Sequence, residues 1–334
     1  MEKPEKLSFA MLPTPLERLE RTGKVYDAHL WVKRDDLTGG AENGNKIRKL
    51  EYLACEAARQ NANILITCGG EQSNHCRATA IVARRLGMDI HLVLRRTAEG
   101  PTGNFLLDLI LGATIRWVTP EEYEMRDVIM LEEAEKLRRT GKMPYIIPEG
   151  GSNSLGIWGY VSAAEELIGQ ANEIGFTPEY IVIPSGSGGT YAGLWIGLKI
   201  LSDKTKVVGI TSGADIEQQR EHISKISADF CAKYDVGFKP VHSEISLIDR
   251  YWRGGYGIID EELAQFICDF AKNEGLILDP TYTGKAFLGA LTMIENGELP
   301  RDKNIVLWHT GGIFGLFTKG QYFRELYFSG GRAK

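Results

Sequence analysis

The sequence predicts an α/β protein whose sheets are open, twisted and mostly parallel, with helices on both faces. Three observations support this fold class. Short runs rich in β-branched residues alternate with helical stretches along most of the chain, as strands joined by crossover helices do. The 334 residues exceed one average domain of ~150 residues and predict about two domains. Hydrophobic residues make up 43% and charged residues 25% of the chain, which is typical of a globular protein.

The predicted strands are the apolar runs at 63–68, 89–94, 114–118, 144–147, 179–184, 206–211 and 304–309. Between them we expect amphipathic helices, such as those at 120–139 and 260–274. Two blocks of strand and helix can be separated, 47–160 and 161–334, with Gly150-Gly151-Ser152-Asn153 near the junction. In open α/β sheets the loops at the carboxyl ends of the strands converge on a crevice, so polar motifs in these loops are the first candidates for function.

Composition excludes several classes of function. The net charge of -5 is mild and no long block of Lys or Arg is present, so we expect no binding to nucleic acid or to an acidic membrane surface. The first ten residues carry charges of both signs, unlike a signal peptide, and no apolar run is long enough to span a bilayer. The five cysteines lack CxxC spacing, which argues against a disulfide framework and a zinc site. We therefore expect a cytoplasmic protein without a metal.

A loop rich in glycine and serine follows the predicted strand at 179–184 and precedes a predicted helix at 194–201. It reads Ser185-Gly186-Ser187-Gly188-Gly189-Thr190. Successive backbone N–H groups at a helix start hold a dianionic phosphate, and the Ser and Thr hydroxyls add donors. A purely structural turn is the alternative, and the three hydroxyls argue against it. The loop therefore predicts a phosphate site.

Two nucleotide-binding motifs can be tested on this loop. A dinucleotide fingerprint that starts at Gly186 requires glycine at position 191, where the chain has Tyr191. A Walker loop fails because Leu194 and Trp195 follow Gly193, where lysine and Ser or Thr are required. Both nucleotide interpretations are therefore rejected.

Lys46 is the candidate reactive amine. It follows Asn45, a plausible N-cap, so we expect its ammonium in the first turn of a helix, where the dipole lowers the pKa of the amine. Lys49 is the rival. Lys46 shares a helical face with Leu50, Leu53 and Ala57, so we expect Lys46 to be the more buried amine. An amine that can form a Schiff base and a phosphate cradle together indicate pyridoxal 5′-phosphate (PLP); a solvated surface lysine is the alternative.

Further polar segments stand at predicted strand and helix ends. The stretch 68–77 contains Ser73, Asn74 and His75, and its N–H groups can bind a carboxylate. The alternatives are that Ser73 is only an N-cap and His75 only a polar helix residue. The segments 253–257, 279–285 and 308–312 contribute Tyr256, Tyr282 and Thr310, and each is a weak signal by itself.

Together these segments resemble the D-cysteine desulfhydrase and 1-aminocyclopropane-1-carboxylate (ACC) deaminase branch of the fold-type II PLP enzymes. The resemblance covers almost the whole chain: Pro13-Thr14-Pro15-Leu16, Lys33-Arg34-Asp35-Asp36, residues 44–51, Gln72-Ser73-Asn74-His75, the 185–190 loop, Asp279-Pro280-Thr281-Tyr282 and His309-Thr310-Gly311-Gly312. It implies two sheets in the arrangement of the tryptophan synthase β-like fold. It also implies a small inserted domain at 47–160, a large PLP-binding domain made of 1–46 and 161–334, and a homodimer.

The resemblance also implies roles for the candidate residues. Lys46 would bind PLP covalently, Asn74 would bond the 3′ oxygen of the cofactor, and residues 185–190 would bind its phosphate. Ser73 would contact the substrate carboxylate or assist proton transfer, with Asn74 and His75 beside it. Tyr256 and Tyr282 would flank the substrate in the cleft between the domains.

One position separates the two activities of this branch. Where ACC deaminases have an acidic residue after the tyrosine of the 279–282 segment, this chain has Thr283, so Thr310 becomes the candidate partner of the ring nitrogen. A hydroxyl stabilises a protonated ring nitrogen less than a carboxylate does, which makes the ring a weaker electron sink. This favours β-elimination, because the departing group itself removes the electrons. We expect conversion of D-cysteine to pyruvate, hydrogen sulfide and ammonia, with α-proton removal by Lys46 and assistance from Ser73 or Tyr282.

Other functions stay open. L-cysteate with sulfite release is one, because Glu71 departs from the expected apolar residue and because Arg250 and Arg253 stand near Tyr256, where an arginine could bind a sulfonate. The alternative is that both arginines are exposed loop residues. D-Serine dehydration and ACC deamination are two more. A metabolite-binding protein that lost catalysis is a different class, and the intact Lys46 argues against it.

Overall fold

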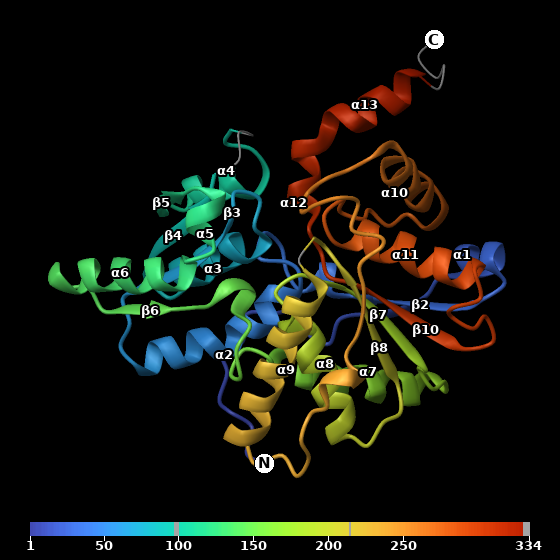
Figure 1. Cartoon of the computed structure of the whole chain (residues 1–334), viewed down its shortest axis with the longest axis horizontal. Helices are drawn as coiled ribbons and strands as arrows, with labels where there is room; N and C mark the ends of the chain where they lie inside the picture. The colour runs from blue at the N-terminus through green and yellow to red at the C-terminus, as the bar shows by residue number, and fades with distance from the viewer. Residues whose placement is uncertain (97–99, 214, 330–334) are drawn as a thin grey trace.

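The computed structural model describes residues 1–96, 100–213 and 215–329 and contains two sheets (Figure 1). One has six strands in the order β1-β2-β10-β7-β8-β9, and the other has four in the order β5-β4-β3-β6. Every strand pair is parallel except β1 with β2. The predicted fold class, two mostly parallel sheets with flanking helices, is therefore confirmed.

The four-stranded sheet consists of β3 (Ile64–Gly70), β4 (Asp89–Arg95), β5 (Thr114–Val118) and β6 (Pro144–Ile146). Side chains alternate along its strands, so that Leu65 faces α2 (Asn45–Arg59) and α3 (Asn74–Arg85), whereas Ile66 faces α6 (Arg126–Arg139). Both faces are buried, which explains why these strands read as continuous apolar runs. The other helices of this part are α4 (Gly103–Ile110) and α5 (Pro120–Tyr123).

The six-stranded sheet consists of β1 (Leu16–Arg18), β2 (His29–Arg34), β7 (Tyr180–Ser185), β8 (Lys206–Thr211), β9 (Ser246–Ile248) and β10 (Asn304–His309). One face packs on α7 (Trp158–Ile174), α8 (Gly189–Ile200) and α9 (Ile216–Lys233). The opposite face packs on α10 (Glu261–Glu274) and α11 (Thr283–Glu295). Neighbouring residues of β7 divide between these two cores, Ile181 facing α7 and Val182 facing α11.

Helix α2 connects the two halves, because its residues contact both α3 and α7 (Figure 1). The remaining helices are α1 (Glu20–Tyr26), α12 (Ile313–Leu316) and α13 (Gly320–Ser329). Four short 3₁₀ turns complete the described structure, at Asp35–Leu37, Glu149–Gly151, His242–Glu244 and Phe317–Lys319. None of the described helices is both long and apolar enough to cross a membrane.

All seven predicted strands are present, and their ends lie within two residues of the predicted ends. Three strands escaped the sequence analysis: β1, β2 and β9. Strand β2 contains the charged residue Lys33, whose side chain is fully buried because it pairs with Glu166 of α7 at 2.5 Å. That partner stands 133 positions away, so the local pattern gives no sign that Lys33 belongs to a core strand.

Two helix predictions need correction. The helix expected at 120–139 is broken: α5 ends at Tyr123 and α6 begins at Arg126. Tyr123 turns inward at the break, is only 6% exposed, and donates a hydrogen bond to Glu149 at 3.0 Å. The helix expected at 194–201 begins five residues earlier, at Gly189. Its first turn contains glycine, whose low helix propensity hid the true start.

Candidate active site

A cavity of about 480 Å³ lies where loops from both sheets meet. This volume falls within the range of roughly 300–1,000 Å³ that is common for small-molecule sites. Most of the predicted site residues line it: Lys46, Ser73, Asn74, His75, Ser185, Gly186, Ser187, Gly188, Thr190, Tyr256, Tyr282 and Thr310. Gly189 is the one predicted site residue that is not part of this lining. Segments far apart in the sequence therefore converge on one space.

Lys46 stands in the first turn of α2, but Asn45 does not cap that helix. The N-cap is Gly44 with φ 105°, and Asn45 is already helical. A Cβ on Gly44 would lie 2.8 Å from the Thr310 carbonyl oxygen, so the close approach of these two segments requires glycine there. The predicted N-cap was therefore wrong. The Asn45 amide instead accepts from Lys46 Nζ at 3.1 Å and donates to Thr190 Oγ1 at 2.9 Å.

The electrostatic surroundings of Lys46 favour a neutral amine. Burial is the largest cause that lowers its pKa, to about 8, and the charge of Arg77 acts in the same direction. Glu149 and Asp279 partly oppose this shift. A large fraction of the Lys46 amine is therefore unprotonated at mildly alkaline pH, as a nucleophile requires.

The predicted difference in burial between Lys46 and Lys49 was wrong. Lys49 is 1% exposed, whereas Lys46 is partly exposed and faces the cavity. Lys49 Nζ donates to the carbonyl oxygen of Gly150 at 3.1 Å and to Ser152 Oγ at 3.3 Å. The turn at Glu149–Gly151 covers Lys49, and no helical periodicity could reveal that cover. Lys46 lines the cavity, whereas Lys49 does not.

The loop between β7 and α8 offers unpaired donors to the cavity. Among the described residues, the backbone N–H groups of Gly186, Ser187 and Gly188 have no acceptor. The Ser185 hydroxyl is buried and also lacks a partner within the described chain. Gly188 has φ 77°, and a Cβ there would lie 2.5 Å from Ile223 Cγ1, so this position needs glycine. Such unsatisfied donors fit an anionic phosphate at a helix start.

Gly189 lies between the loop and Lys49. A Cβ on Gly189 would lie 2.4 Å from Ser152 Oγ and 2.8 Å from Lys49 Nζ. The Lys49 amino group therefore lies directly beneath the start of α8, and burial, with the nearby charge of Lys46, lowers its pKa well below the usual value. Ser152 also contacts Ser187 through their hydroxyl oxygens at 2.8 Å. The sequence analysis did not place Lys49 and Ser152 beside this loop, because they stand 35 or more positions away from the loop residues that they approach.

The loop after β3 presents Ser73 and Asn74. Ser73 caps α3, since its hydroxyl accepts from the N–H of Cys76 at 3.2 Å, so the N-cap interpretation is confirmed. The same side chain lines the cavity. Asn74 Oδ1 accepts from Arg77 at 3.1 Å and from Asn104 at 3.0 Å. The amide nitrogen of Asn74 is therefore the end that can donate to a ligand oxygen.

His75 is buried beside these residues, and its Nε2 forms a hydrogen bond with Thr67 Oγ1 at 2.9 Å. Burial, with the nearby charges of Lys46 and Lys49, lowers the pKa of His75 well below its usual value. The ring is therefore neutral at physiological pH and does not add positive charge to the site.

Tyr256 and Tyr282 meet at the side of the cavity. Their ring centroids are 5.7 Å apart at an interplanar angle of 77°, and Lys46 Nζ lies 6.0 Å from the Tyr282 centroid. Burial raises the pKa of Tyr256 to about 12 and that of Tyr282 well above its usual value. Both phenols are therefore protonated at neutral pH.

Two buried charged residues hold the segments that carry these tyrosines. Asp279 accepts from the N–H groups of Thr281, Tyr282 and Thr283 at 2.8 to 3.0 Å. Lys285 donates to the carbonyl oxygens of Trp252 and Gly255 at 2.6 and 2.7 Å, just before Tyr256. Asp279 and Lys285 were visible in the sequence only as members of a polar motif, and their positioning contacts came with the structure.

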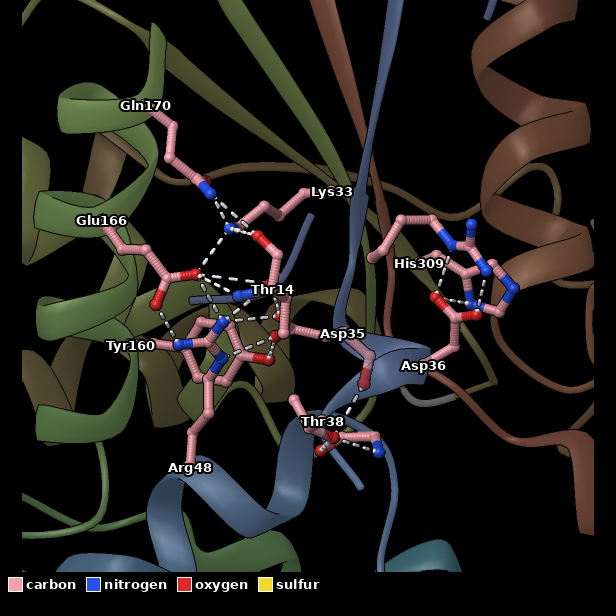
Figure 2. A network of polar contacts seen from close by, with 12 residues as sticks. Thr14, Lys33, Asp35, Asp36, Thr38, Arg48, Tyr160, Glu166, Gln170 and His309 are labelled. Atoms are coloured by element: carbon pink, nitrogen blue, oxygen red, sulfur yellow. Dashed lines mark hydrogen bonds and ion pairs between the residues drawn. The ribbon is translucent and has the colours of Figure 1, made fainter. Parts of the chain in front are cut away.

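A buried ionic network lies behind the start of α2 (Figure 2). Arg48 donates to Asp35 at 2.8 and 3.0 Å and to Glu166 at 2.9 Å. Lys33 and Tyr160 contact the same two carboxylates, each at 2.5 Å. Figure 2 shows Arg48 pointing from α2 into this cluster between Asp35 and Glu166. Lys46 stands in the first turn of α2, and the network joins this end of the helix to Lys33 of β2 and to Glu166 of α7.

The arginines singled out near Tyr256 do not reach the cavity. Arg250 pairs with Glu298, and Arg253 pairs with Asp260 at 3.0 Å and Glu262 at 2.5 Å. Both therefore act as loop residues paired with acids, and the argument that they bind a sulfonate was wrong. Arg95 and Arg126 line the cavity instead. Thr310 lines it as well, whereas Thr283 is fully buried against Asp279.

Comparison with known proteins identifies the family. The profile of the family described as "Pyridoxal-phosphate dependent enzyme" matches residues 7–311. The chain belongs to this family. The cofactor of this family, PLP, carries a phosphate, and the unpaired donors of the 185–190 loop fit a phosphate.

Individual relatives of this PLP family are similar over nearly the whole chain. A putative ACC deaminase of Thermotoga maritima is 42% identical over 316 residues, which cover 95% of this chain and 99% of that protein. A mitochondrial bifunctional D-cysteine desulfhydrase/ACC deaminase of Arabidopsis thaliana is 38% identical over 93% of this chain and 79% of its own. The crystal structure of an ACC deaminase homologue matches with a TM-score of 0.89 at 38% identity and covers 97% of both chains.

Proposed function

We propose that this protein is a PLP-dependent lyase that removes the β-substituent of D-cysteine and releases hydrogen sulfide, pyruvate and ammonia. One arrangement carries the choice of β-elimination. Thr283 Oγ1 donates to Asp279 at 2.7 Å and does not line the cavity, whereas Thr310 lines it, so the Thr310 hydroxyl would be the partner of the ring nitrogen. A PLP ring whose nitrogen is paired with a hydroxyl withdraws electrons weakly. This favours β-elimination, in which the leaving group takes the electrons.

The residues of the cavity fit the cofactor. When bound, PLP would supply an aldehyde that captures the substrate amine and a ring that withdraws electrons from the α-carbon. The unpaired N–H groups of residues 186–188 and the Ser185 hydroxyl would hold its phosphate. The Asn74 amide nitrogen would donate to the 3′ oxygen. Lys46, which faces the cavity, would form the covalent bond to the aldehyde.

Proton transfer is assigned to Lys46. With its pKa lowered to about 8, the free amine can accept the α proton of the substrate near neutral pH. Tyr282 is a protonated phenol near Lys46, so it can donate a proton or a hydrogen bond but does not act as a base. Ser73, at the end of the carboxylate-binding loop, would hold the substrate carboxylate in place.

A panel of substrates tests this function. Purified holoenzyme would be incubated with D-cysteine, L-cysteine, L-cysteate, D-serine and ACC, and pyruvate and 2-oxobutyrate would be measured. We expect D-cysteine to give the highest kcat/KM, with pyruvate as product. Dominant 2-oxobutyrate from ACC would overturn the argument from Thr283 and Thr310. A Lys46→Ala variant with full turnover would remove Lys46 from its role.

A protein that binds a metabolite without catalysis is the alternative from another class. An absorbance scan distinguishes the two, because PLP bound through Lys46 absorbs in the visible. No visible band, before or after added PLP, would reject the proposed lyase.

The domain boundaries and the oligomeric state also remain proposals. We propose a small inserted domain at 47–160, a large domain made of 1–46 and 161–334, and a homodimer in the cytoplasm. Limited proteolysis would test the boundaries, and sedimentation equilibrium would test the dimer. A monomer at micromolar concentration would contradict the proposed homodimer.

A further inference from the structure

Arg95 is a cavity residue to which the proposed reaction assigns no task. It ends β4, opposite Gly70 in the parallel register with β3. Its guanidinium carbon lies 5.3 Å from the ring centroid of Tyr123 and 5.7 Å from that of Tyr256. The side chain therefore stands between an aromatic ring of each half of the molecule, at the wall of the cavity.

The guanidinium of Arg95 has no carboxylate partner among the residues that the structure describes. Within the described chain, no acceptor lies within hydrogen-bond distance of it either. Arg126, the second arginine of the cavity, differs, because its Nε lies 3.0 Å from Glu149 Oε2. Stacking on tyrosine rings satisfies the faces of a guanidinium but leaves its in-plane N–H donors available. A partly buried cation with free donors is a binding site for an anion.

The location of Arg95 points to the side-chain end of the substrate. A Cβ on Gly70 would lie 3.7 Å from Tyr256 Cε1 and 3.8 Å from Arg95 Nη2, so these three residues converge on one point. A Cβ on Gly69 would lie 2.6 Å from Ser73 Oγ, which places Ser73 next along the same loop. With the substrate carboxylate at Ser73, the substituent on the β-carbon is the group left to meet Arg95.

We propose that Arg95 is the specificity residue of this site and binds an anionic group on the β-carbon of the amino-acid substrate. The site therefore prefers a thiolate or a sulfonate substituent to a neutral hydroxyl. This inference rests on the proposed β-elimination. In that reaction the α proton moves to the Lys46 amine, the Cβ–S bond breaks, and its electron pair leaves with sulfur. From cysteate the leaving anion is sulfite. From a cysteine thiolate, the sulfur takes up the proton that Lys46 removed and leaves as hydrosulfide, and the guanidinium holds the leaving anion.

Binding of matched ligands to the holoenzyme tests this role. Both enantiomers of cysteate, which has a sulfonate, and of alanine, which has a neutral methyl group, would be titrated into wild-type protein and an Arg95→Gln variant by calorimetry. Arg95→Gln should weaken binding of the preferred cysteate enantiomer by roughly 10- to 100-fold, as expected when a charge-assisted hydrogen bond is lost. Alanine affinity should change less than about twofold, since alanine has no anionic substituent. Arg95→Lys should restore part of the loss, because it keeps the charge but not the planar fork.

Controls separate this role from a structural one. Arg250→Gln removes an exposed arginine that is paired with Glu298 outside the cavity, and it should leave both affinities unchanged. Equal losses for alanine and cysteate in Arg95→Gln would mean that Arg95 only supports the cleft, which would overturn the inference. Undiminished cysteate binding would overturn it as well.

The outcome also distinguishes this inference from the proposed function. Suppose that the wild-type holoenzyme turns over D-cysteine but that Arg95→Gln does not change cysteate binding. The proposed function then stands, and the inference about Arg95 is wrong. If the wild-type protein binds no amino acid and releases no pyruvate, both the proposed function and the inference about Arg95 are wrong.

Discussion

Tyr282 Oη donates a hydrogen bond to Tyr256 Oη over 3.1 Å, which joins two loops that stand 26 residues apart. One loop precedes α11 and is held by Asp279, and the other is held by Lys285. The pair places a protonated phenol near Lys46. We regard this contact as the feature that orients Tyr282 toward the reacting atoms.

Removing either hydroxyl should affect turnover to different degrees. Tyr282→Phe deletes the group next to Lys46, and we expect kcat/KM to fall roughly 100-fold, as for the loss of a general acid. Tyr256→Phe removes only the acceptor, and a loss of roughly tenfold corresponds to one hydrogen bond. Steady-state kinetics with D-cysteine measure both. Equal, small effects in the two variants would contradict the proposed role of Tyr282.

The pH dependence follows from the same pair. Because burial raises the pKa of Tyr256 to about 12 and that of Tyr282 well above its usual value, neither phenol ionises in the ordinary working range. We therefore expect the alkaline limb of the kcat/KM profile to be the same in wild type and Tyr256→Phe. An alkaline limb that disappears in the variant would show that Tyr256 titrates.

Lys46 should lower the stability of the folded protein. Its pKa falls from 10.5 in the unfolded chain to about 8, so the folded state binds fewer protons between these values. Stability therefore rises with pH across the window from 8 to 10.5, and the penalty is fully present below pH 8. The shift corresponds to about 3 kcal/mol as an upper bound.

A substitution with an uncharged side chain tests this penalty. In cofactor-free protein at pH 7, Lys46→Met should be more stable than wild type by up to about 3 kcal/mol, and the difference should vanish near pH 10.5. Urea unfolding at the two pH values measures it. Lys24→Met, a change at the end of helix α1 far from the cavity, serves as control. A destabilised Lys46→Met would be evidence that the amine stabilises the fold.

The network around Arg48 should contribute strongly to stability. Arg48→Leu would leave Asp35 and Glu166 with less positive charge beside them, and Asp35 is fully buried. Breaking a buried ion pair in this way costs about 3 to 5 kcal/mol. The matched control is Arg59→Leu on the same helix, whose contact with Glu5 is exposed and worth at most about 1 kcal/mol. Urea unfolding of the two variants would compare them, and equal losses would contradict the role of the network.

Acid should weaken the same network. Burial raises the pKa of Asp35, but the charges of Arg48 and Lys33 and the hydrogen bonds from Arg48 and Tyr160 together outweigh burial and hold this pKa below its usual value. A depressed carboxylate pKa stabilises the fold above the unfolded pKa, and the contribution is lost as pH falls through the folded one. The difference between wild type and Arg48→Leu should therefore shrink below about pH 4. A difference that is constant from pH 7 to pH 3 would contradict an ionic origin.

Gly188 should be needed for cofactor binding. An alanine there would adopt φ 77° with strain of about 1 to 3 kcal/mol, and its Cβ would contact Ile223 at 2.5 Å. We expect Gly188→Ala to weaken PLP binding at least about tenfold, because the loop must shift and its N–H groups lose their common direction. Gly169→Ala is the control, since a Cβ at that helical position meets no atom within 4 Å. Dissociation constants from equilibrium dialysis measure both, and unchanged PLP affinity in Gly188→Ala would remove the loop from the phosphate site.

Local patterns in the sequence predicted most of the fold. The seven apolar runs became strands because parallel strands buried on both faces need continuous β-branched sequence. Strand β2 was missed because its buried Lys33 is neutralised by Glu166, which stands 133 positions away. The break between α5 and α6 was missed because Tyr123 turns inward to meet Glu149, a contact that helical periodicity does not record.

For the site, the sequence by itself determined the glycine and serine loop at 185–190, the lysine at a helix start, and the polar segments that surround the cavity. These signals are local, since a phosphate needs consecutive donors and a helix start needs a short polar sequence. Only the tertiary structure decided that Lys46 faces the cavity while Lys49 is covered, and that Arg95 rather than Arg250 or Arg253 reaches it. Whether a side chain is exposed and whether its charge is neutralised depend on residues of distant strands and helices. A single sequence does not show which of these residues become neighbours.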